Sequence, residues 1–181
     1  MMTELKHDWA RIEAYYFETL KEQKYHVGLA SDNQAIIEVK RLIPGDVETI
    51  LDVGSGRLGS GFPTQVDVWK GADFHWLPYS DKSFDLIWAR HALEHSPMPF
   101  FALREWMRVS KKYLLIVVPE TIPYIAEYEG HWTCLPEYGW LALFRKAGLC
   151  VSVSEFGHWL HKCSSKPEGQ PLGEWRFLCR I

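Results

Sequence analysis

The run Tyr113-Leu-Leu-Ile-Val-Val118 is the feature that most constrains the fold. Six successive apolar residues leave no polar face, so a strand made from them must be covered on both sides, as in the parallel sheet of an α/β protein. The run is also far shorter than the ~20 residues that cross a bilayer as a helix. We therefore expect an α/β fold and no membrane span.

Shorter strand-like runs alternate with helical segments along the rest of the chain. Amphipathic spacing predicts helices over 5–24, 31–42, 99–109 and 136–147. Further strands are predicted at 49–53, 65–68, 84–88, 149–154 and 175–179. This order predicts a Rossmann-like, mostly parallel sheet of seven strands or fewer, with helices on both faces and an antiparallel C-terminal hairpin. Ligands of such sheets bind beyond the carboxyl ends of the strands.

Length and charge limit the class of protein. The 181 residues favour a single domain, in which we expect the helices of 1–46 to form a lid or substrate cover. The formal charge of −3 provides no basic excess for a nucleic-acid backbone, so no nucleic-acid partner is expected. The N-terminus lacks the apolar segment of a signal peptide, and no CxxC pair occurs. Cys150 and Cys179 are predicted to be buried thiols, which favours a cytoplasmic location.

A glycine-rich loop follows the first predicted strand. Gly54, Gly56 and Gly59 form a GxGxxG pattern, in which glycines let backbone N–H groups approach a ligand. A dinucleotide site also needs a helix after the loop, to place its N-terminus at the pyrophosphate. Gly61 and Pro63 disfavour such a helix here. The pattern alone is therefore compatible with a strand-ending turn or with a nucleoside site that has no phosphate clamp.

Acidic and aromatic residues after the next strand support the nucleoside site. Asp67 ends that strand, where a carboxylate can accept both hydroxyls of a ribose. Trp69 can lie against a purine or pack in the core. Asp73 can accept a hydrogen bond from an exocyclic amino group.

Several segments together resemble the class I S-adenosylmethionine (SAM)-dependent methyltransferases, and most closely the methyltransferase type 11 family. The segments are Ile50-Leu-Asp-Val-Gly-Ser-Gly56, Val66-Asp-Val68, the stretch 72–87 with its D-x-x-x-L-P-x-x-D-x-S-F-D pattern, and His91-Ala-Leu-Glu-His95. The D-x-x-x-L-P pattern followed by Leu-Glu-His is more specific than the glycines. The similarity covers roughly residues 47–150.

The resemblance implies that the strand ends hold SAM. It places the methionine part along the glycine loop, the ribose at Asp67, and adenine between the residues after the second strand and Asp73. The residues expected to contact SAM are Asp52, Gly54, Ser55, Gly56, Arg57, Asp67, Val68, Trp69, Asp73, Phe74 and Arg90.

One segment departs from the family. Only nine residues separate Gly56 from Val66, where the family usually has a full helix. The methionine carboxylate therefore lacks a helix N-terminus, and a guanidinium can take its place. We predict that Arg57 or Arg90 pairs with that carboxylate.

Histidines are the candidate bases, because their pKa lies near neutrality. We expect His91 and His131 to be catalytic, whereas Glu94-His95 is expected to brace its loop. No histidine–cysteine spacing matches a common zinc module, so no metal site is expected.

Three functions remain open from the sequence. The first is methyl transfer to oxygen or nitrogen of a small molecule, such as a sugar, a lipid-linked head group or an aromatic acceptor. The second is a catalytically inactive SAM-binding module or partner subunit. The third, disfavoured by the missing helix, is an NAD(P)-dependent oxidoreductase.

Overall fold

A computed structural model of the chain describes residues 34–56, 59–67, 70–122, 126–127, 130–159 and 172–181. Within these residues one sheet of six strands has the order β2-β1-β3-β4-β6-β5. The strands are β1 (Ile50–Val53), β2 (Thr64–Val66), β3 (Phe84–Arg90), β4 (Ser110–Pro119), β5 (Cys150–Trp159) and β6 (Leu172–Arg180). The first four run parallel, and β6 pairs antiparallel with both β4 and β5.

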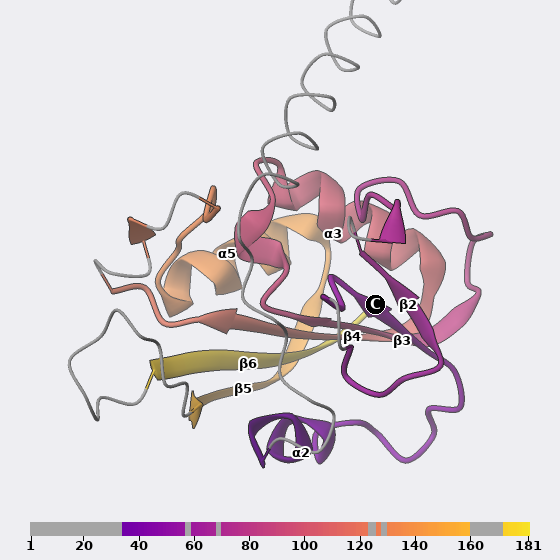
Figure 1. Cartoon of the computed structure of the whole chain (residues 1–181), viewed down its shortest axis with the longest axis horizontal. Helices are drawn as coiled ribbons and strands as arrows, with labels where there is room; N and C mark the ends of the chain where they lie inside the picture. Colours follow the sequence, from indigo (N-terminus) through magenta and orange to yellow (C-terminus); the bar gives the residue numbers. More distant parts are fainter. Residues whose placement is uncertain (1–33, 57–58, 68–69, 123–125, 128–129, 160–171) are drawn as a thin grey trace, which may run out of the picture.

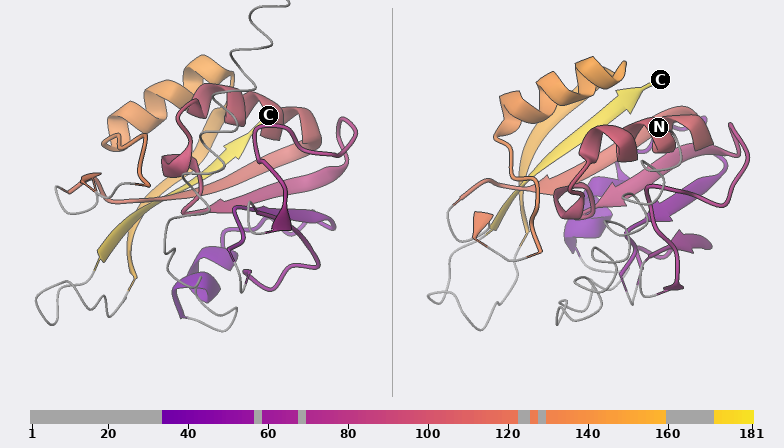
Figure 2. Two further views of the ribbon diagram at one scale, coloured as in Figure 1. Left: turned by 45° about the horizontal axis from the view of Figure 1, so that its top comes forward. Right: turned by 90° about the horizontal axis from the view of Figure 1, so that it is seen from above.

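Helices cover the sheet on both sides, giving three layers (Figure 1). Helices α3 (Pro99–Val109) and α5 (Glu137–Ala147) lie on one face, and α2 (Gln34–Lys40) lies on the other, as the rotated views in Figure 2 also show. A single 3₁₀ turn, η2 (Leu93–His95), follows β3. Gly148 ends α5 in the left-handed conformation, with φ of 96°.

Alternating residues of the strands form two apolar clusters, one under each helical layer. On β3, Ile87 and Ala89 belong to the cluster beneath α3 and α5, whereas Leu86 and Trp88 face α2. Val117 and Leu115 of β4 likewise face α2, and their neighbours pack on the opposite side. The unbroken apolar run in β4 is explained by this double cover.

The predicted elements are confirmed with three qualifications. No seventh strand occurs within the described residues, and the predicted helix 5–24 lies outside them. Cys179 is buried, but the prediction that Cys150 is buried is wrong, because it is exposed. Cys150 begins β5, an edge strand whose alternate side chains face solvent.

Helix α2, which lies within the predicted N-terminal cover of residues 1–46, packs into the core. Its Ile36 and Val39 are buried against the β3 and β4 side chains of the second cluster. A lid role for residues 1–46 stays a prediction, since 1–33 lie outside the described residues. None of the helices in the described ranges combines the length and apolar character needed to span a bilayer.

Asp85, at the start of β3, holds the two residues that precede β1 against the sheet. Its Oδ2 accepts hydrogen bonds from the Glu48 N–H at 3.1 Å, and from the Thr49 N–H and hydroxyl, both at 2.9 Å. Burial by itself would raise the pKa of Asp85, but these hydrogen bonds and Lys111 lower it to about 2. The ionised carboxylate therefore stabilises the edge of the sheet opposite the expected ligand site.

Replacing Asp85 with Asn is expected to destabilise the fold at neutral pH by about 2 kcal/mol, the scale of hydrogen bonds to a charged group. Because the folded pKa lies below the ordinary value, this stabilisation exists above pH ~4 and disappears as the pH falls towards 2. Urea unfolding from pH 2 to 7 would measure it. Asp46→Asn, in an exposed pair with Lys112, is the control with little effect. If the difference in unfolding free energy between wild type and Asp85→Asn does not change with pH, the stabilising role of the ionised Asp85 carboxylate is contradicted.

Candidate functional site

The glycine loop makes a tight turn at the carboxyl end of β1. The N–H groups of Gly54 and Ser55 both donate to the Val66 carbonyl, at 2.9 and 3.2 Å. The N–H of Gly56 donates to Asp67 Oδ2 at 2.7 Å. Gly54 and Gly56 have positive φ values of 69° and 62°, which other residues rarely adopt. Asp67, the residue directly after β2, therefore positions the loop.

Gly54 also allows a close approach between two strand ends. A Cβ built on Gly54 would overlap the Cβ of Ala92, which follows β3. The glycine loop and the segment that begins at Ala92 are thus in direct contact. This contact joins the expected SAM site to the residues after β3.

The shortened segment after the loop is anchored by side chains instead of a helix. Ser60 N–H donates to Asp52 Oδ2 at 2.8 Å, and the Trp88 indole N–H donates to Ser60 Oγ at 3.0 Å. No helix follows in the described residues 59–66. Burial raises the pKa of Asp52 to about 6, although the Ser60 N–H opposes this shift.

Asp73 is positioned by residues that the sequence analysis did not select. Its Oδ1 accepts the His75 backbone N–H at 2.8 Å and the His75 Nδ1–H at 2.7 Å. The other ring nitrogen, Nε2, lies 2.7 Å from Ser96 Oγ, which in turn accepts the Met98 N–H. The second oxygen of Asp73 is buried and has no hydrogen-bond partner among the described residues. Asp73 thus presents a fixed acceptor that lacks a donor.

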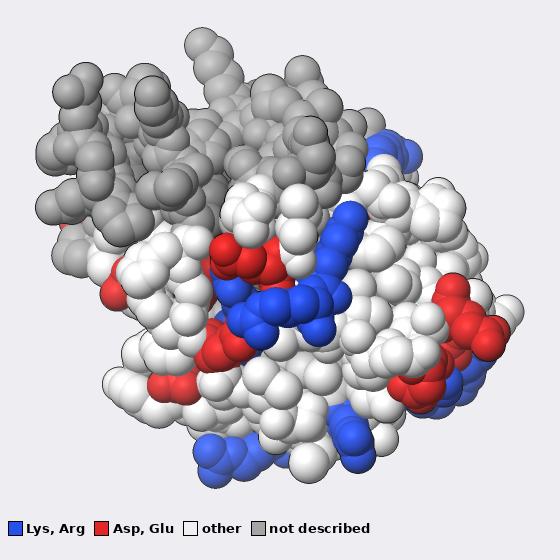
Figure 3. All heavy atoms as spheres, turned by 90° about the horizontal axis from the view of Figure 1, so that it is seen from below, with Lys and Arg blue, Asp and Glu red and all other residues white. Residues whose placement is uncertain are grey.

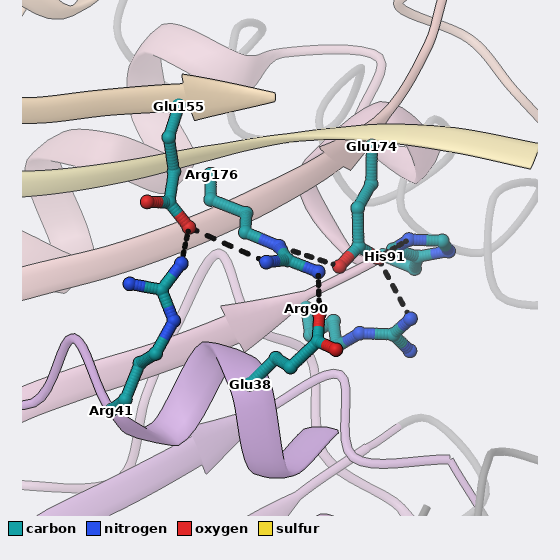
Figure 4. Close-up of polar contacts among 7 residues, drawn as sticks. All are labelled: Glu38, Arg41, Arg90, His91, Glu155, Glu174 and Arg176. Carbon is teal, nitrogen blue, oxygen red and sulfur yellow. Dashed lines mark hydrogen bonds and ion pairs between the residues drawn. The ribbon is translucent and has the colours of Figure 1, made fainter. Parts of the chain in front are cut away.

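Glu174 of β6 joins the two predicted residues at the end of β3. Its Oε2 accepts from Arg90 Nη2 at 2.8 Å and lies 3.1 Å from His91 Nε2 (Figure 4). His91 has a positive φ of 51°, which is uncommon outside glycine. Burial and the Arg90 charge lower the pKa of His91 to about 4, so its ring is neutral at pH 7. Spacing along the sequence could not reveal Glu174, because it lies 83 residues from His91.

The same carboxylate belongs to a wider buried ion network. Arg176 Nε donates to Glu174 Oε1 at 2.9 Å, and its terminal nitrogens lie 3.3 Å from Glu38 of α2 and Glu155 of β5 (Figure 4). Arg176 and Glu174 are both buried. Since buried charges are tolerated only when paired, this network fixes the α2 layer against the C-terminal hairpin.

His131 lies next to the Glu94-His95 turn. The rings of His95 and His131 have centroids 4.8 Å apart. Thr133 N–H and Oγ1 donate to the carbonyls of Glu94 and Ser96, at 3.0 and 2.7 Å, and His95 Nδ1 lies 2.7 Å from the Gly130 carbonyl. The expected bracing is therefore made by His95 and by backbone carbonyls, and not by the Glu94 carboxylate.

The structure brings most of the predicted residues to one edge of the sheet. Residues close to the glycine loop or to the end of β3 are Asp52, Gly54, Ser55, Gly56, Asp67, Arg90 and His91. Phe74 packs in the core, edge-on to Trp106. Arg57, Val68 and Trp69 lie outside the described residues. Arg90 is paired with Glu174, so its predicted contact with the methionine carboxylate stays a prediction.

Comparison with known families and structures fits this geometry. Residues 51–117 match the methyltransferase domain family. Among proteins of curated function, none matches the chain.

Solved structures share the fold at low sequence identity. A SAM-dependent methyltransferase from Thermotoga maritima is 18% identical with a TM-score of 0.60, over 82% of this chain and 89% of that one. For a SAM-dependent methyltransferase from Aquifex aeolicus the identity is 15% and the TM-score 0.57, over 83% and 92%. CalH, crystallised with S-adenosylhomocysteine, is 14% identical with a TM-score of 0.55, over 81% and 54%. The chain therefore has the class I fold of the SAM-dependent methyltransferases, and its residues 51–117 carry the sequence pattern of the methyltransferase domain family.

Proposed function

We propose that the protein is a SAM-dependent methyltransferase that acts on oxygen or nitrogen of a small molecule. The observation that carries the proposal is the buried Asp73 oxygen without a hydrogen-bond partner in the described part of the chain. A buried acceptor of this kind needs a donor, and the exocyclic amino group of adenine is one. The glycine turn and Asp67 lie at the adjoining strand ends, where the methionine part and the ribose fit.

The remaining residues fit the chemistry of methyl transfer. When bound, SAM supplies a methyl group on a positively charged sulfur, so the protein has to align the acceptor and exclude water. Asp52 orients the amino group of the methionine part. His91, neutral and held by Glu174, can accept a proton from the acceptor, and His131 is the second candidate base.

Two observations support a small acceptor in a reducing compartment. On the face of the molecule that carries α2, Lys and Arg lie beside Asp and Glu and form no continuous basic surface (Figure 3). The pair Arg41–Glu155, whose arginine lies just after α2 and is exposed, contributes to this mixture. The three cysteines within the described residues are free thiols, which supports the cytoplasm as the location.

Ligand binding and turnover separate the remaining functions. In calorimetry with SAM, S-adenosylhomocysteine, NAD and NADP, we expect binding of SAM and S-adenosylhomocysteine only. Binding of only NAD or NADP would favour an oxidoreductase. Release of S-adenosylhomocysteine from SAM with sugar, aromatic and amine acceptors would then distinguish an enzyme from an inactive SAM-binding module.

Asp67→Ala is expected to weaken SAM binding by about 1.5–3 kcal/mol, because two ribose hydroxyls lose a charged acceptor. Asp67→Asn should weaken it less. Asp81→Ala, in an exposed pair with Arg108, is the matched control and should bind SAM as wild type does. Calorimetry on variants with intact circular dichroism measures the effect. An unchanged affinity in folded Asp67→Ala would remove Asp67 from the site.

The affinity for SAM is expected to increase as the pH rises through about 6. Asp52 ionises in this range, and its negative charge attracts the ammonium group of the methionine part. Titrations between pH 5 and 8 with S-adenosylhomocysteine and with 5′-methylthioadenosine, which lacks the ammonium group, test this directly. The rise should occur only with the first ligand, and it should be absent in Asp52→Asn. Equal pH dependence for both ligands would show that Asp52 does not act on the amino group.

A further inference from the structure

The carboxyl group of Glu94 is buried and has no hydrogen-bond partner within the part of the chain that the structure describes. The residue is 1% exposed, and neither carboxylate oxygen has a hydrogen-bond partner among the described residues. An isolated buried carboxylate is costly, and protonating it would still leave its O–H without an acceptor. A buried polar group of this kind calls for a ligand, either a water molecule or an ion.

Two histidines stand beside this carboxyl group. One ligand atom each from Glu94, His95 and His131 lie within 4.8 Å of one another. Ligand atoms around a tetrahedral ion with bonds of about 2.1 Å lie about 3.4 Å apart. Small side-chain rotations would therefore bring the three onto one ion.

The surrounding contacts orient the histidine for ligation. The Gly130 carbonyl can only accept a hydrogen bond, so His95 Nδ1 carries the hydrogen and its Nε2 carries the lone pair. A second-shell carbonyl of this kind commonly orients a histidine that binds a metal. The two Thr133 hydrogen bonds to the 94–96 segment hold the loop of His131 in place. The charge of the neighbouring Arg90 is compensated by Glu174.

We propose that Glu94, His95 and His131 bind a divalent transition-metal ion, and that this ion holds a hydroxyl group of the methyl acceptor. Two imidazoles and one carboxylate favour zinc, iron, cobalt, nickel or manganese over magnesium. Three protein ligands leave a coordination position open, as in catalytic metal sites. The proposal replaces the sequence-based expectation of no metal site.

The site lies next to the expected position of SAM. Ala92, two residues before Glu94, contacts the glycine loop at Gly54. Ser96, one residue after His95, is linked through His75 to Asp73. Glu94 and His95 thus lie in a short stretch of chain whose two ends contact the glycine loop and the residue that positions Asp73.

The role of the ion rests on the proposed function and concerns oxygen acceptors. A hydroxyl bound to a divalent ion loses its proton more readily. In this arrangement His131 is a metal ligand and not the base. The proton leaves to water, and the oxygen forms a new bond to the methyl carbon. The bond between that carbon and sulfur breaks, and its electron pair stays on sulfur.

Metal binding can be measured without an acceptor. The purified protein, treated with a chelator and desalted, is titrated with Co²⁺, Zn²⁺ and Mg²⁺, and bound metal is counted by mass spectrometry. We expect about one Co²⁺ or Zn²⁺ per chain, a visible absorption band for Co²⁺, and weak Mg²⁺ binding. Glu94→Gln and His131→Ala should lower the Co²⁺ affinity by about tenfold or more. His158→Ala, an exposed histidine on β5, is the matched control and should keep the wild-type affinity.

Addition of S-adenosylhomocysteine separates the two proposals. If the ion lies beside the cofactor, S-adenosylhomocysteine should shift the visible absorption band of bound Co²⁺. Glu94→Gln should still bind S-adenosylhomocysteine in calorimetry. Co²⁺ binding without binding of S-adenosylhomocysteine would refute the proposed function and keep the metal site. Absence of Co²⁺ and Zn²⁺ binding, or equal Co²⁺ affinity in wild type, Glu94→Gln and His131→Ala, would overturn the metal site.

Discussion

The contact between Gly54 and Ala92 is the constraint on which the candidate site depends. Strands β1 and β3 run parallel and adjacent, so their carboxyl ends meet at one edge of the sheet. The glycine loop and the segment after β3 can approach each other only because Gly54 has no Cβ. A larger residue would separate the expected cofactor site from Glu94 and His95. The absence of a Cβ at Gly54 therefore keeps the proposed cofactor site close to the proposed metal ligands.

A second constraint is the loss of the helix that usually follows such a loop. Its N–H groups would have formed part of the ligand site and held the loop against the sheet. In this chain, Asp52 and Trp88 hold the replacement segment through Ser60. This anchoring requires a buried carboxylate, whose raised pKa makes it sensitive to pH near 6. The compact loop thus gives a structural role to Asp52, the same residue that we propose orients the amino group of SAM.

Buried charge connects the site to the rest of the protein. Glu174 contacts Arg90 and His91 at the end of β3, and it shares Arg176 with residues of α2 and β5. The buried charges of Glu174 and Arg176 are tolerated because each has a partner of opposite charge. His91 is consequently held in place by the C-terminal hairpin, far from it in sequence.

The sequence by itself determined the α/β class and the positions of most helices and strands along the chain, and it is the source of the prediction that the loop residues hold SAM. The reason is that these features depend on local patterns: the apolar run of β4, the limits of α3 and α5, and the short spacing from Asp52 to Asp73. Local patterns predict burial less well in an edge strand, as the exposed Cys150 of β5 shows. The neighbours of His91, His75 and Glu94 from distant parts of the chain were decided only by tertiary structure. Glu174, Ser96 and His131 lie 83, 21 and 37 residues from them in the chain, and strand pairing and loop packing bring them close in space.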